Sequence, residues 1–223
     1  MKPAPFTYHA PDFLEDALAI LGDTAGDDGR ILAGGQSLVP MMALRLAEPA
    51  HLVDINRIAE LDHVAMDGDT LSIGALVRHE RFQTLETQGV LGQLLRDVSV
   101  NIAHLPIRLR GTFCGSLANA DPASEWCLAA VTLDARITAR RRSGSRIINA
   151  VDFFKGVMTT ALAPDEILTS VEFSAPPRNT QMGFYEFNRR AGDFALAMGL
   201  VSYRVEDGAV VEPRIGLGGV EAY

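Results

Sequence analysis

The stretch ILAGGQSLVP, residues 31–40, joins a short apolar run to a Gly-Gly pair and then to small polar residues. Glycine adopts positive φ without steric cost, and because it has no Cβ it lets backbone N–H groups approach a ligand closely. The stretch matches neither GxxxxGK(S/T) nor GxGxxG, which disfavours a P-loop hydrolase and a Rossmann dinucleotide site. Taken alone, it fits an ordinary strand-to-helix turn better than an anion site at a helix start.

The elements around this stretch predict a small α/β lobe. Residues 12–21 have the apolar spacing of an amphipathic helix, with Asp12 as its N-cap. Residues 31–33 and 51–55 have the composition of short strands, and residues 37–46 that of a helix between them. Strand, turn, helix and strand in this order are typical of a compact α/β unit.

The rest of the chain alternates between hairpins and helical segments. Pro176-Pro177 is the clearest linker, because neither proline can extend a helix or a central strand. The remaining predicted elements are hairpins at 64–75 and 136–148, helical segments at 79–105 (ending near Pro106) and 126–133, and a strand-rich segment at 183–220.

Composition and charge exclude several functional classes. The chain has 223 residues, 48% hydrophobic and 22% charged, as in ordinary globular proteins. No apolar run reaches the ~20 residues of a membrane helix, and no signal-peptide core is recognisable, so we expect a cytoplasmic protein. A net charge of −8 argues against nucleic acid. Arg140-Arg141-Arg142 precedes Ser-Gly-Ser and is best explained as a solvated hairpin tip.

Cysteine and histidine patterns point to no metal site. Cys114 and Cys127 form no CxxC pair, which rules out a self-contained four-cysteine zinc or iron–sulfur site. Two reduced thiols are the simpler assumption than a disulfide in a chain without a secretion signal. The histidines lack HExxH-like spacing. We therefore expect a metal-free chain.

A second glycine segment, GTFCGSLANADPASE at 111–125, changes the interpretation of the first. Two small-residue loops from different parts of the chain can hold a pyrophosphate between them. Asn119, Asp121 and Glu125 are then candidates for binding ribityl or ribose hydroxyls. The structural alternative makes Asp121 a helix N-cap with Pro122 at the first helical position. A hydrolytic carboxylate pair is a poor alternative, because no positioned histidine or nucleophile accompanies the acids.

The combination of motifs resembles the FAD-binding medium subunit of the xanthine dehydrogenase and aerobic carbon monoxide dehydrogenase family of molybdenum hydroxylases. The resemblance covers nearly the whole chain in the family order, although each motif by itself is unspecific. The segments that carry it are AGGQSLVPMMALRLAEPAHLVDINRI (33–58), LSIGALVRHE (71–80), RLRGTFCGSLANADPASE (108–125), DFFKGVMTTALAPDEIL (152–168), RRAGDFALA (189–197) and RIGLGGV (214–220).

The resemblance implies an α+β fold built from α/β lobes. It predicts a two-lobed FAD-binding domain at residues 1–176, with lobe one at about 1–57 and lobe two at about 58–176. The start of a smaller C-terminal α+β domain would occupy residues 177–223. Relatives continue for several dozen residues past the GLGGV segment, so we expect a truncated C-terminal domain with an exposed sheet edge.

The resemblance also assigns cofactor-binding positions and no catalytic or metal-binding residue. Phe194 matches a position whose aromatic ring lies near the isoalloxazine in some relatives, although an apolar residue alone is more often core. The two loops would hold the pyrophosphate, the acids fall on flavin-contact positions and Leu162 on an apolar contact. With Asn119 added from the residue-level reasoning above, the full set is Ala33, Gly34, Gly35, Gln36, Ser37, Thr112, Phe113, Cys114, Gly115, Ser116, Asn119, Asp121, Glu125, Leu162 and Phe194.

Two departures from the family pattern bear on the second loop. Cys114 stands where relatives usually have glycine, and its Cβ is tolerated only if the residue avoids positive φ. Pro106 stands where a glutamine often precedes the Ile-Arg pair. These positions decide whether the second loop keeps the family geometry.

The implied function is electron transfer through FAD. In this family a large molybdenum-cofactor subunit oxidises the substrate, a small [2Fe-2S] subunit relays electrons, and the medium subunit passes them from FAD to an external acceptor. The alternatives are a self-sufficient FAD-dependent oxidase or reductase of the same fold, and a flavin-free assembly subunit. The partners expected are the two other subunits, with no nucleic acid and no membrane span.

Overall fold

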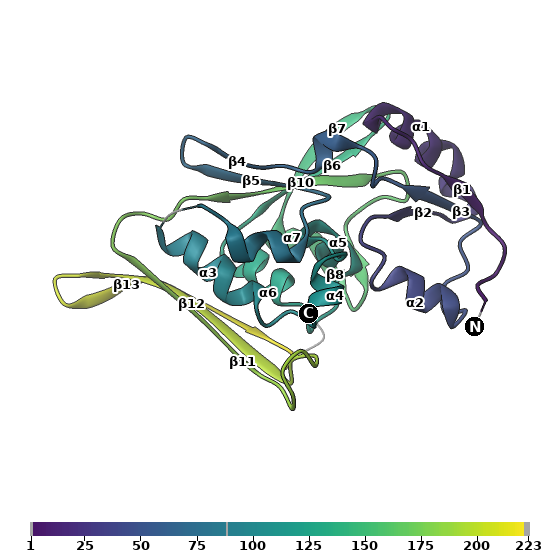
Figure 1. Ribbon diagram of the computed structural model, residues 1–223. Helices are drawn as coiled ribbons and strands as arrows, with labels where there is room; N and C mark the ends of the chain where they lie inside the picture. Colours follow the sequence, from purple (N-terminus) through teal and green to yellow (C-terminus); the bar gives the residue numbers. More distant parts are fainter. Residues whose placement is uncertain (1, 88, 221–223) are drawn as a thin grey trace.

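The first lobe is built on a small parallel sheet. The computed structural model describes residues 2–87 and 89–220. Strands β1 (Thr7–His9), β2 (Gly29–Leu32) and β3 (His51–Asp54) pair in the order β1-β3-β2, all parallel. Parallel neighbours require crossover connections, which α1 (Leu14–Thr24) and α2 (Leu38–Ala43) provide. The predicted α/β unit is confirmed, and its two helices lie at the right of Figure 1.

Helix α1 differs from the prediction at its start. The helix begins at Leu14 with Phe13 as its N-cap, so the assignment of Asp12 as N-cap is wrong. Asp12 instead lies 3.9 Å from the guanidinium of Arg57. The apolar stripe is as predicted, because Leu14, Leu18 and Leu21 are buried. The tertiary contact of an apolar face fixes this helix more firmly than the capping residue does.

The second lobe contains a five-stranded antiparallel sheet. Its strands are β4 (Val64–Asp67), β5 (Thr70–Gly74), β6 (Arg136–Arg141), β7 (Gly144–Asn149) and β10 (Ile167–Ser174), in the order β4-β5-β10-β6-β7. Both predicted hairpins are confirmed. Strand β10 joins them by pairing with β5 on one side and β6 on the other. A separate two-stranded sheet of β8 (Phe154–Gly156) and β9 (Thr159–Thr160) contacts the helices α5 and α7.

Short helices cover one face of this sheet. They are α3 (Gly89–Ser99), α4 (Leu105–Arg108), α5 (Phe113–Asn119), α6 (Glu125–Thr132) and α7 (Ala150–Phe153), with 3₁₀ turns at Ala59–Leu61 and His79–Thr84. A further 3₁₀ turn, Ala25–Asp27, follows α1 in the first lobe. The predicted helical segment 79–105 is therefore interrupted. Pro106 lies in the first turn of α4 and starts a helix, whereas we expected the helix to end there. Proline suits this position because the first helical N–H groups have no intrahelical partner.

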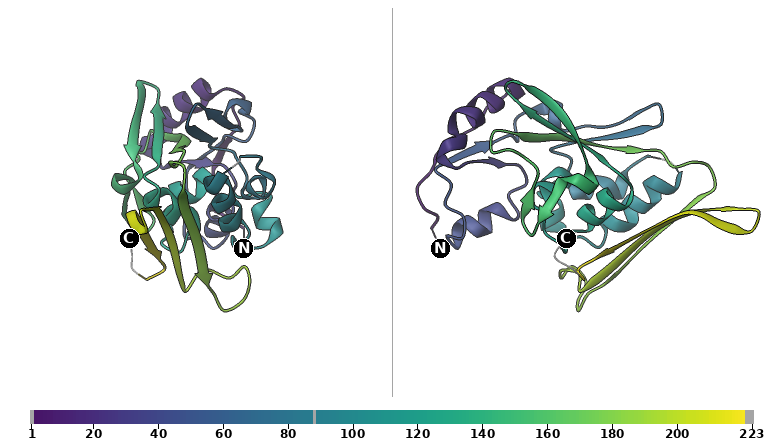
Figure 2. Two further views of the ribbon diagram at one scale, coloured as in Figure 1. Left: turned by 90° about the vertical axis from the view of Figure 1, so that its left-hand side faces the viewer. Right: turned by 180° about the vertical axis from the view of Figure 1, so that it is seen from behind.

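A third sheet closes the other side of these helices. Strands β11 (Thr180–Phe187), β12 (Ala197–Glu206) and β13 (Ala209–Gly218) form an antiparallel meander, which confirms the strand-rich C-terminal segment. The meander contacts α3 and α6, so the helices lie between two antiparallel sheets (Figures 1 and 2). Its outer face exposes Tyr185, Phe187 and Ile215. The domain boundaries at residues 57 and 176 stay predictions.

The core of the second lobe is aromatic. Trp126 is fully buried against Phe82 and Phe113, with ring centroids 4.7 Å and 4.8 Å away. Phe173 of β10 meets Phe113 edge to face at 6.0 Å. This packing fixes α5 and α6 on the sheet, and with them the start of α5 that the sequence had marked as a second loop.

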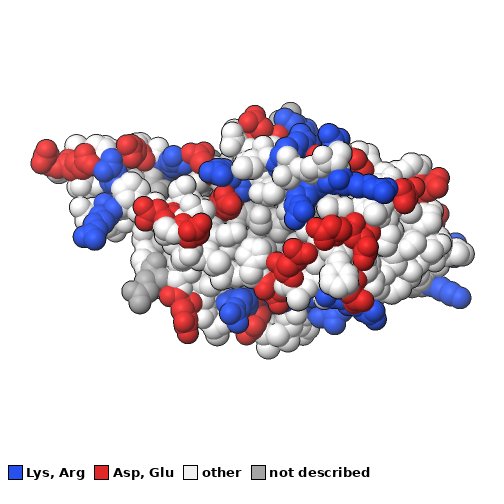
Figure 3. Space-filling model, turned by 90° about the horizontal axis from the view of Figure 1, so that it is seen from above, with Lys and Arg blue, Asp and Glu red and all other residues white. Residues whose placement is uncertain are grey.

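Surface charge is mixed. Seen from above, basic and acidic side chains are interspersed over the molecule (Figure 3). On the β6–β7 hairpin, Arg140 lies 3.7 Å from Glu15 and Arg142 3.7 Å from Asp23, both acids of α1. The predicted solvated hairpin tip is confirmed. Among the described residues, no helix is both long and apolar enough to cross a membrane.

Candidate functional site

The first glycine loop connects β2 to α2 and is held in one conformation. Gly35 has a φ of +72°, in the left-handed region that favours glycine. The Gln36 side-chain amide donates to the Gly34 carbonyl at 2.9 Å, and the Val39 N–H donates to the Gly35 carbonyl at 3.0 Å. Asn56, which follows β3, donates from Nδ2 to the Ala33 carbonyl at 2.8 Å. Local bonds thus fix the loop before any ligand enters.

The second loop is the start of α5. Thr112 is its N-cap, and Thr112 Oγ1 accepts a hydrogen bond from the Gly115 N–H at 3.0 Å. Cys114 lies inside the helix, so it avoids positive φ and its Cβ is tolerated. Its thiol points into the core, with Sγ 3.6 Å from the Gly74 carbonyl oxygen. The departure from glycine at this position therefore leaves the loop backbone intact.

The two loops touch through their backbones. A Cβ on Gly34 would lie 2.5 Å from the Arg110 carbonyl oxygen and 2.6 Å from the Gly111 Cα, so only glycine fits there. The Arg78 guanidinium bridges the same junction. It donates to the Arg110 carbonyl on one side and to Asn56 Oδ1 at 2.5 Å on the other. Asn56 in turn bonds the first loop, so one chain of hydrogen bonds joins both loops.

A cavity of about 540 Å³ opens between the lobes at this junction. Its volume is within the range of small-molecule and cofactor sites. It brings together all but one of the residues predicted from the sequence as cofactor-binding. The members that line it are Ala33, Gly34, Gly35, Gln36, Ser37, Thr112, Cys114, Gly115, Ser116, Asn119, Asp121, Glu125, Leu162 and Phe194.

Phe113 is the exception, and its neighbourhood explains why. Its side chain is fully buried in the aromatic core beside Trp126, and its N–H donates to the Val77 carbonyl at 3.0 Å. Phe194 shows the reverse. It is 75% exposed and lies on the cavity wall, so the simpler expectation of a core side chain is wrong for it.

An ion pair between a buried carboxylate and an exposed arginine shapes the wall that carries Leu162. Glu166 is 7% exposed and accepts two hydrogen bonds from Arg146, both at 2.7 Å. Glu166 also accepts from the Ala163 N–H at 2.8 Å, while Arg146 donates to the Ala161 carbonyl at 2.7 Å. The hydrogen bond from Arg146 lowers the pKa of Glu166. Carboxylate and guanidinium together hold residues 161–163 against the cavity.

The acids of the second segment have distinct environments. Asp121 Oδ1 accepts from the Ala123 N–H at 2.9 Å and closes a turn, while α6 begins at Glu125 with Ser124 as N-cap. The alternative of Asp121 as helix N-cap with Pro122 at the first position is therefore wrong. Glu125 is 9% exposed, and burial, followed by the nearby charges of Glu186 and Asp121, raises its pKa to about 7.

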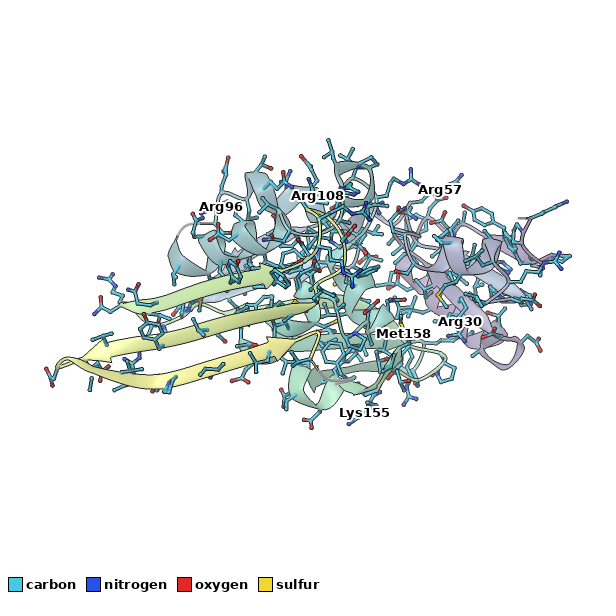
Figure 4. All side chains as sticks on the ribbon, turned by 90° about the horizontal axis from the view of Figure 1, so that it is seen from below. Arg30, Arg57, Arg96, Arg108, Lys155 and Met158 are labelled. Atoms are coloured by element: carbon cyan, nitrogen blue, oxygen red, sulfur yellow. The ribbon has the colours of Figure 1, made fainter. Side chains whose placement is uncertain are left out.

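Several lining residues were missed from the sequence. Figure 4 labels Arg30 on the first lobe and Arg108 on the second. Arg30 lines the cavity, and Arg108 donates to the Ala103 carbonyl at 2.7 Å and so fixes part of its wall. The other missed members include Ile55, His79, Ile102, Ile107, Gly111, Glu166 and Asp193. They come from several separate segments of the chain, and only the fold shows which of them face the cavity.

Comparison with known families matches most of the chain. Residues 4–176 match the model of the FAD binding domain in molybdopterin dehydrogenase. The caffeine dehydrogenase subunit beta of a Pseudomonas species is 38% identical over 218 residues, which cover 97% of this chain and 74% of that protein. The carbon monoxide dehydrogenase medium chain of Afipia carboxidovorans is 35% identical, over 97% of this chain and 75% of that protein.

Solved structures give the same assignment. The structure of carbon monoxide dehydrogenase from Hydrogenophaga pseudoflava, in a form that lacks the Mo-pyranopterin moiety of the molybdenum cofactor, superposes with a TM-score of 0.95. Its sequence is 35% identical, and the alignment covers all of this chain and 77% of that one. The predicted α+β medium-chain fold is thereby confirmed. The chain belongs to the FAD-binding domain family of the molybdopterin dehydrogenases and is an oxidoreductase subunit.

Proposed function

We propose that this chain binds FAD in the cavity between its lobes and transfers electrons from iron–sulfur clusters to an external acceptor. The observation that carries the proposal is the contact of the two glycine loops at the Gly34–Gly111 junction. Two loops without protruding side chains leave room for a pyrophosphate and present backbone N–H donors to it. A nucleotide cofactor with one pyrophosphate and one aromatic ring system fits this arrangement.

Different lining residues contact different parts of FAD. The glycine loops hold the pyrophosphate, while Asn119, Asp121 and Glu125 offer acceptors to ribityl or ribose hydroxyls. Phe194 and Leu162 provide apolar contacts for the ring system. FAD, when bound, supplies the redox chemistry that connects one-electron carriers to an external acceptor. The chain itself binds and orients the cofactor, and none of these residues is assigned as a general acid or base.

The partners follow from the relatives. Subunit alpha of the 6-hydroxypseudooxynicotine dehydrogenase complex and the carbon monoxide dehydrogenase medium chain are each named as one part of a larger assembly. We infer a large molybdenum-cofactor subunit and a small [2Fe-2S] subunit as partners here, in the cytoplasm. Affinity purification from the native host tests this. Recovery with a molybdenum and an iron–sulfur protein supports it, whereas unaided turnover of a small substrate by the purified chain contradicts it.

FAD binding is tested by titration of the purified chain. At a free FAD concentration 100-fold above Kd, binding stabilises the fold by about 2.7 kcal/mol. For a chain of this size that corresponds to a rise in Tm of about 5–10 °C. The absence of both a protein-bound flavin spectrum and a rise in Tm would refute the proposal.

A matched pair of glycine variants distinguishes a direct effect of the first loop on FAD binding from the general effect of strain at a glycine with positive φ. Gly35→Asp places a carboxylate in the first loop, where repulsion from the pyrophosphate should abolish binding. Gly208→Asp is the control, because Gly208 has a similar φ of +78° in the β12–β13 turn, and a Cβ added there would have nothing within 4 Å. Equal FAD affinity of the two variants would argue against the first loop as the pyrophosphate site.

A further inference from the structure

His79 lies beneath the junction of the two glycine loops. It begins the 3₁₀ turn after β5, and its N–H donates to the Gly111 carbonyl at 3.1 Å. The side chain is only 4% exposed, yet it contributes to the cavity lining. Buried polar atoms are usually hydrogen-bonded, so each of the two ring nitrogens is expected to have a partner.

One ring nitrogen is occupied by the core. The indole N–H of Trp126 donates to His79 Nδ1 at 3.0 Å. Indole nitrogen is only a donor, so Nδ1 is the acceptor and the proton of a neutral ring resides on Nε2. Burial, followed by the charges of Arg78 and Arg108, lowers the pKa of His79 to about 4. The ring is therefore neutral near pH 7, with an N–H at Nε2.

The other ring nitrogen is left facing open space. His79 Nε2 makes no hydrogen bond to any residue in the described parts of the chain, 2–87 and 89–220. A Cβ on Gly111 would lie 2.6 Å from Nε2, so the missing side chain of Gly111 is what leaves this nitrogen uncovered. Gly111 is also the residue that Gly34 contacts. The uncovered donor thus lies where the first loop meets the second.

We propose that His79 donates a hydrogen bond from Nε2 to a phosphate oxygen of the bound cofactor, an inference that rests on the proposed function of the cavity. A neutral donor suits this place, because it satisfies an anionic oxygen without adding a buried charge to the free protein. The hydrogen bond from Trp126 fixes the tautomer of His79 and so keeps its N–H on Nε2, toward the cavity. His79 becomes a binding residue, and Trp126 a positioning residue that acts through it.

Two amide substitutions at His79 test the roles of its two ring nitrogens separately. In His79→Gln the side-chain amide extends toward the place of Nε2, so a donor toward the cavity remains. In His79→Asn the shorter amide remains near the place of Nδ1 and can still meet Trp126, but the donor toward the cavity is lost. We expect His79→Asn to weaken FAD binding about tenfold or more, and His79→Gln to stay within about threefold of wild type. Wild-type affinity in His79→Asn, or equal losses in both variants, would overturn the assignment.

A measurement on the wild-type chain keeps the inference testable if a variant fails to fold. With ¹⁵N-labelled histidine, the FAD-free protein should show the Nε2–H tautomer for His79, assigned by its absence in His79→Gln. Saturation with FAD should move the Nε2 proton resonance downfield and slow its exchange with water. An unchanged resonance in FAD-saturated protein refutes the inference while FAD binding stands. A wild-type chain that does not bind FAD refutes the proposed function, and the inference with it.

Discussion

Glu125 makes the stability of the FAD-free chain depend on pH in a defined direction. Glu125 is 9% exposed, and burial raises the pKa of its carboxyl from 4.5 to about 7, with Glu186 and Asp121 adding repulsion. The folded state therefore favours the protonated form. This contribution to stability is fully present below about pH 4.5 and is lost as the pH rises through about 7. At 1.36 kcal/mol per pKa unit, the difference amounts to at most about 3 kcal/mol.

Glu125→Gln tests this magnitude, because glutamine imitates the protonated carboxyl in size and lacks its charge. Near pH 4 the variant and wild type should differ little in free energy of unfolding. The difference should grow between pH 4.5 and 7 and reach about 3 kcal/mol in favour of the variant at pH 8.5. Urea unfolding followed by the fluorescence of the single tryptophan, Trp126, measures it at each pH.

Glu48→Gln is the matched control, since Glu48 is exposed and its variant removes the same charge from the surface. Its difference from wild type at each pH sets the baseline. A Glu125→Gln difference that parallels this baseline from pH 4.5 to 8.5 would refute the reasoning. So would a variant less stable than wild type at pH 8.5, because it would mean that the ionised carboxyl has a favourable partner in the cavity.

Two substitutions and one measurement of thiol reactivity test the loops and the core. Gly34→Ala should weaken FAD binding at least tenfold in a fluorescence titration, because its Cβ would lie 2.5 Å from the Arg110 carbonyl oxygen and force the loops apart. Arg78→Met should lower the free energy of unfolding by about 1–3 kcal/mol in urea, since it leaves that same carbonyl without its charged donor. Burial raises the pKa of both Cys114 and Cys127, so neither thiol should react with a disulfide reagent until urea unfolds the chain.

Each of these has its own control. Gly22→Ala adds a methyl group where nothing lies within 4 Å, so it should leave FAD affinity unchanged. Asn56→Ala removes the other acceptor of Arg78, and its effect should not add to that of Arg78→Met, because both break one hydrogen-bond chain. Thiol reaction at the same rate in folded and unfolded protein would contradict the burial of Cys114.

Local sequence made the two glycine segments recognisable. Prediction from local sequence failed for the features that depend on long-range packing. The strand-turn-helix order around Gly35 and both hairpins follow from nearby residues alone. The strand that joins the hairpins, β10, pairs with segments roughly 30 and 100 residues earlier in the chain, and no local pattern reports such a pairing. The N-caps of α1 and α6, Phe13 and Ser124, also escaped prediction, because acidic residues suit turns as well as caps.

Phe113 and Phe194 show why residue type alone did not sort the site from the core. Both are phenylalanines within predicted binding motifs, yet one is fully buried and the other is 75% exposed. The α5 start explains the difference. Phe113 and Cys114 point their side chains into the aromatic core and toward β5, while their neighbours Thr112, Gly115 and Ser116 line the cavity.

The burial of the Phe113 and Cys114 side chains makes the second loop rigid. A loop that binds through backbone N–H groups must be held by something other than the ligand, and here the core holds it through Phe113 and Cys114. The first loop is held differently, by Asn56 and, through Asn56, by Arg78. A half-buried arginine that belongs to neither loop therefore helps to set the separation of the two loops. Under the proposed function, specificity for the cofactor depends on the contacts between the lobes as much as on the glycine motifs themselves.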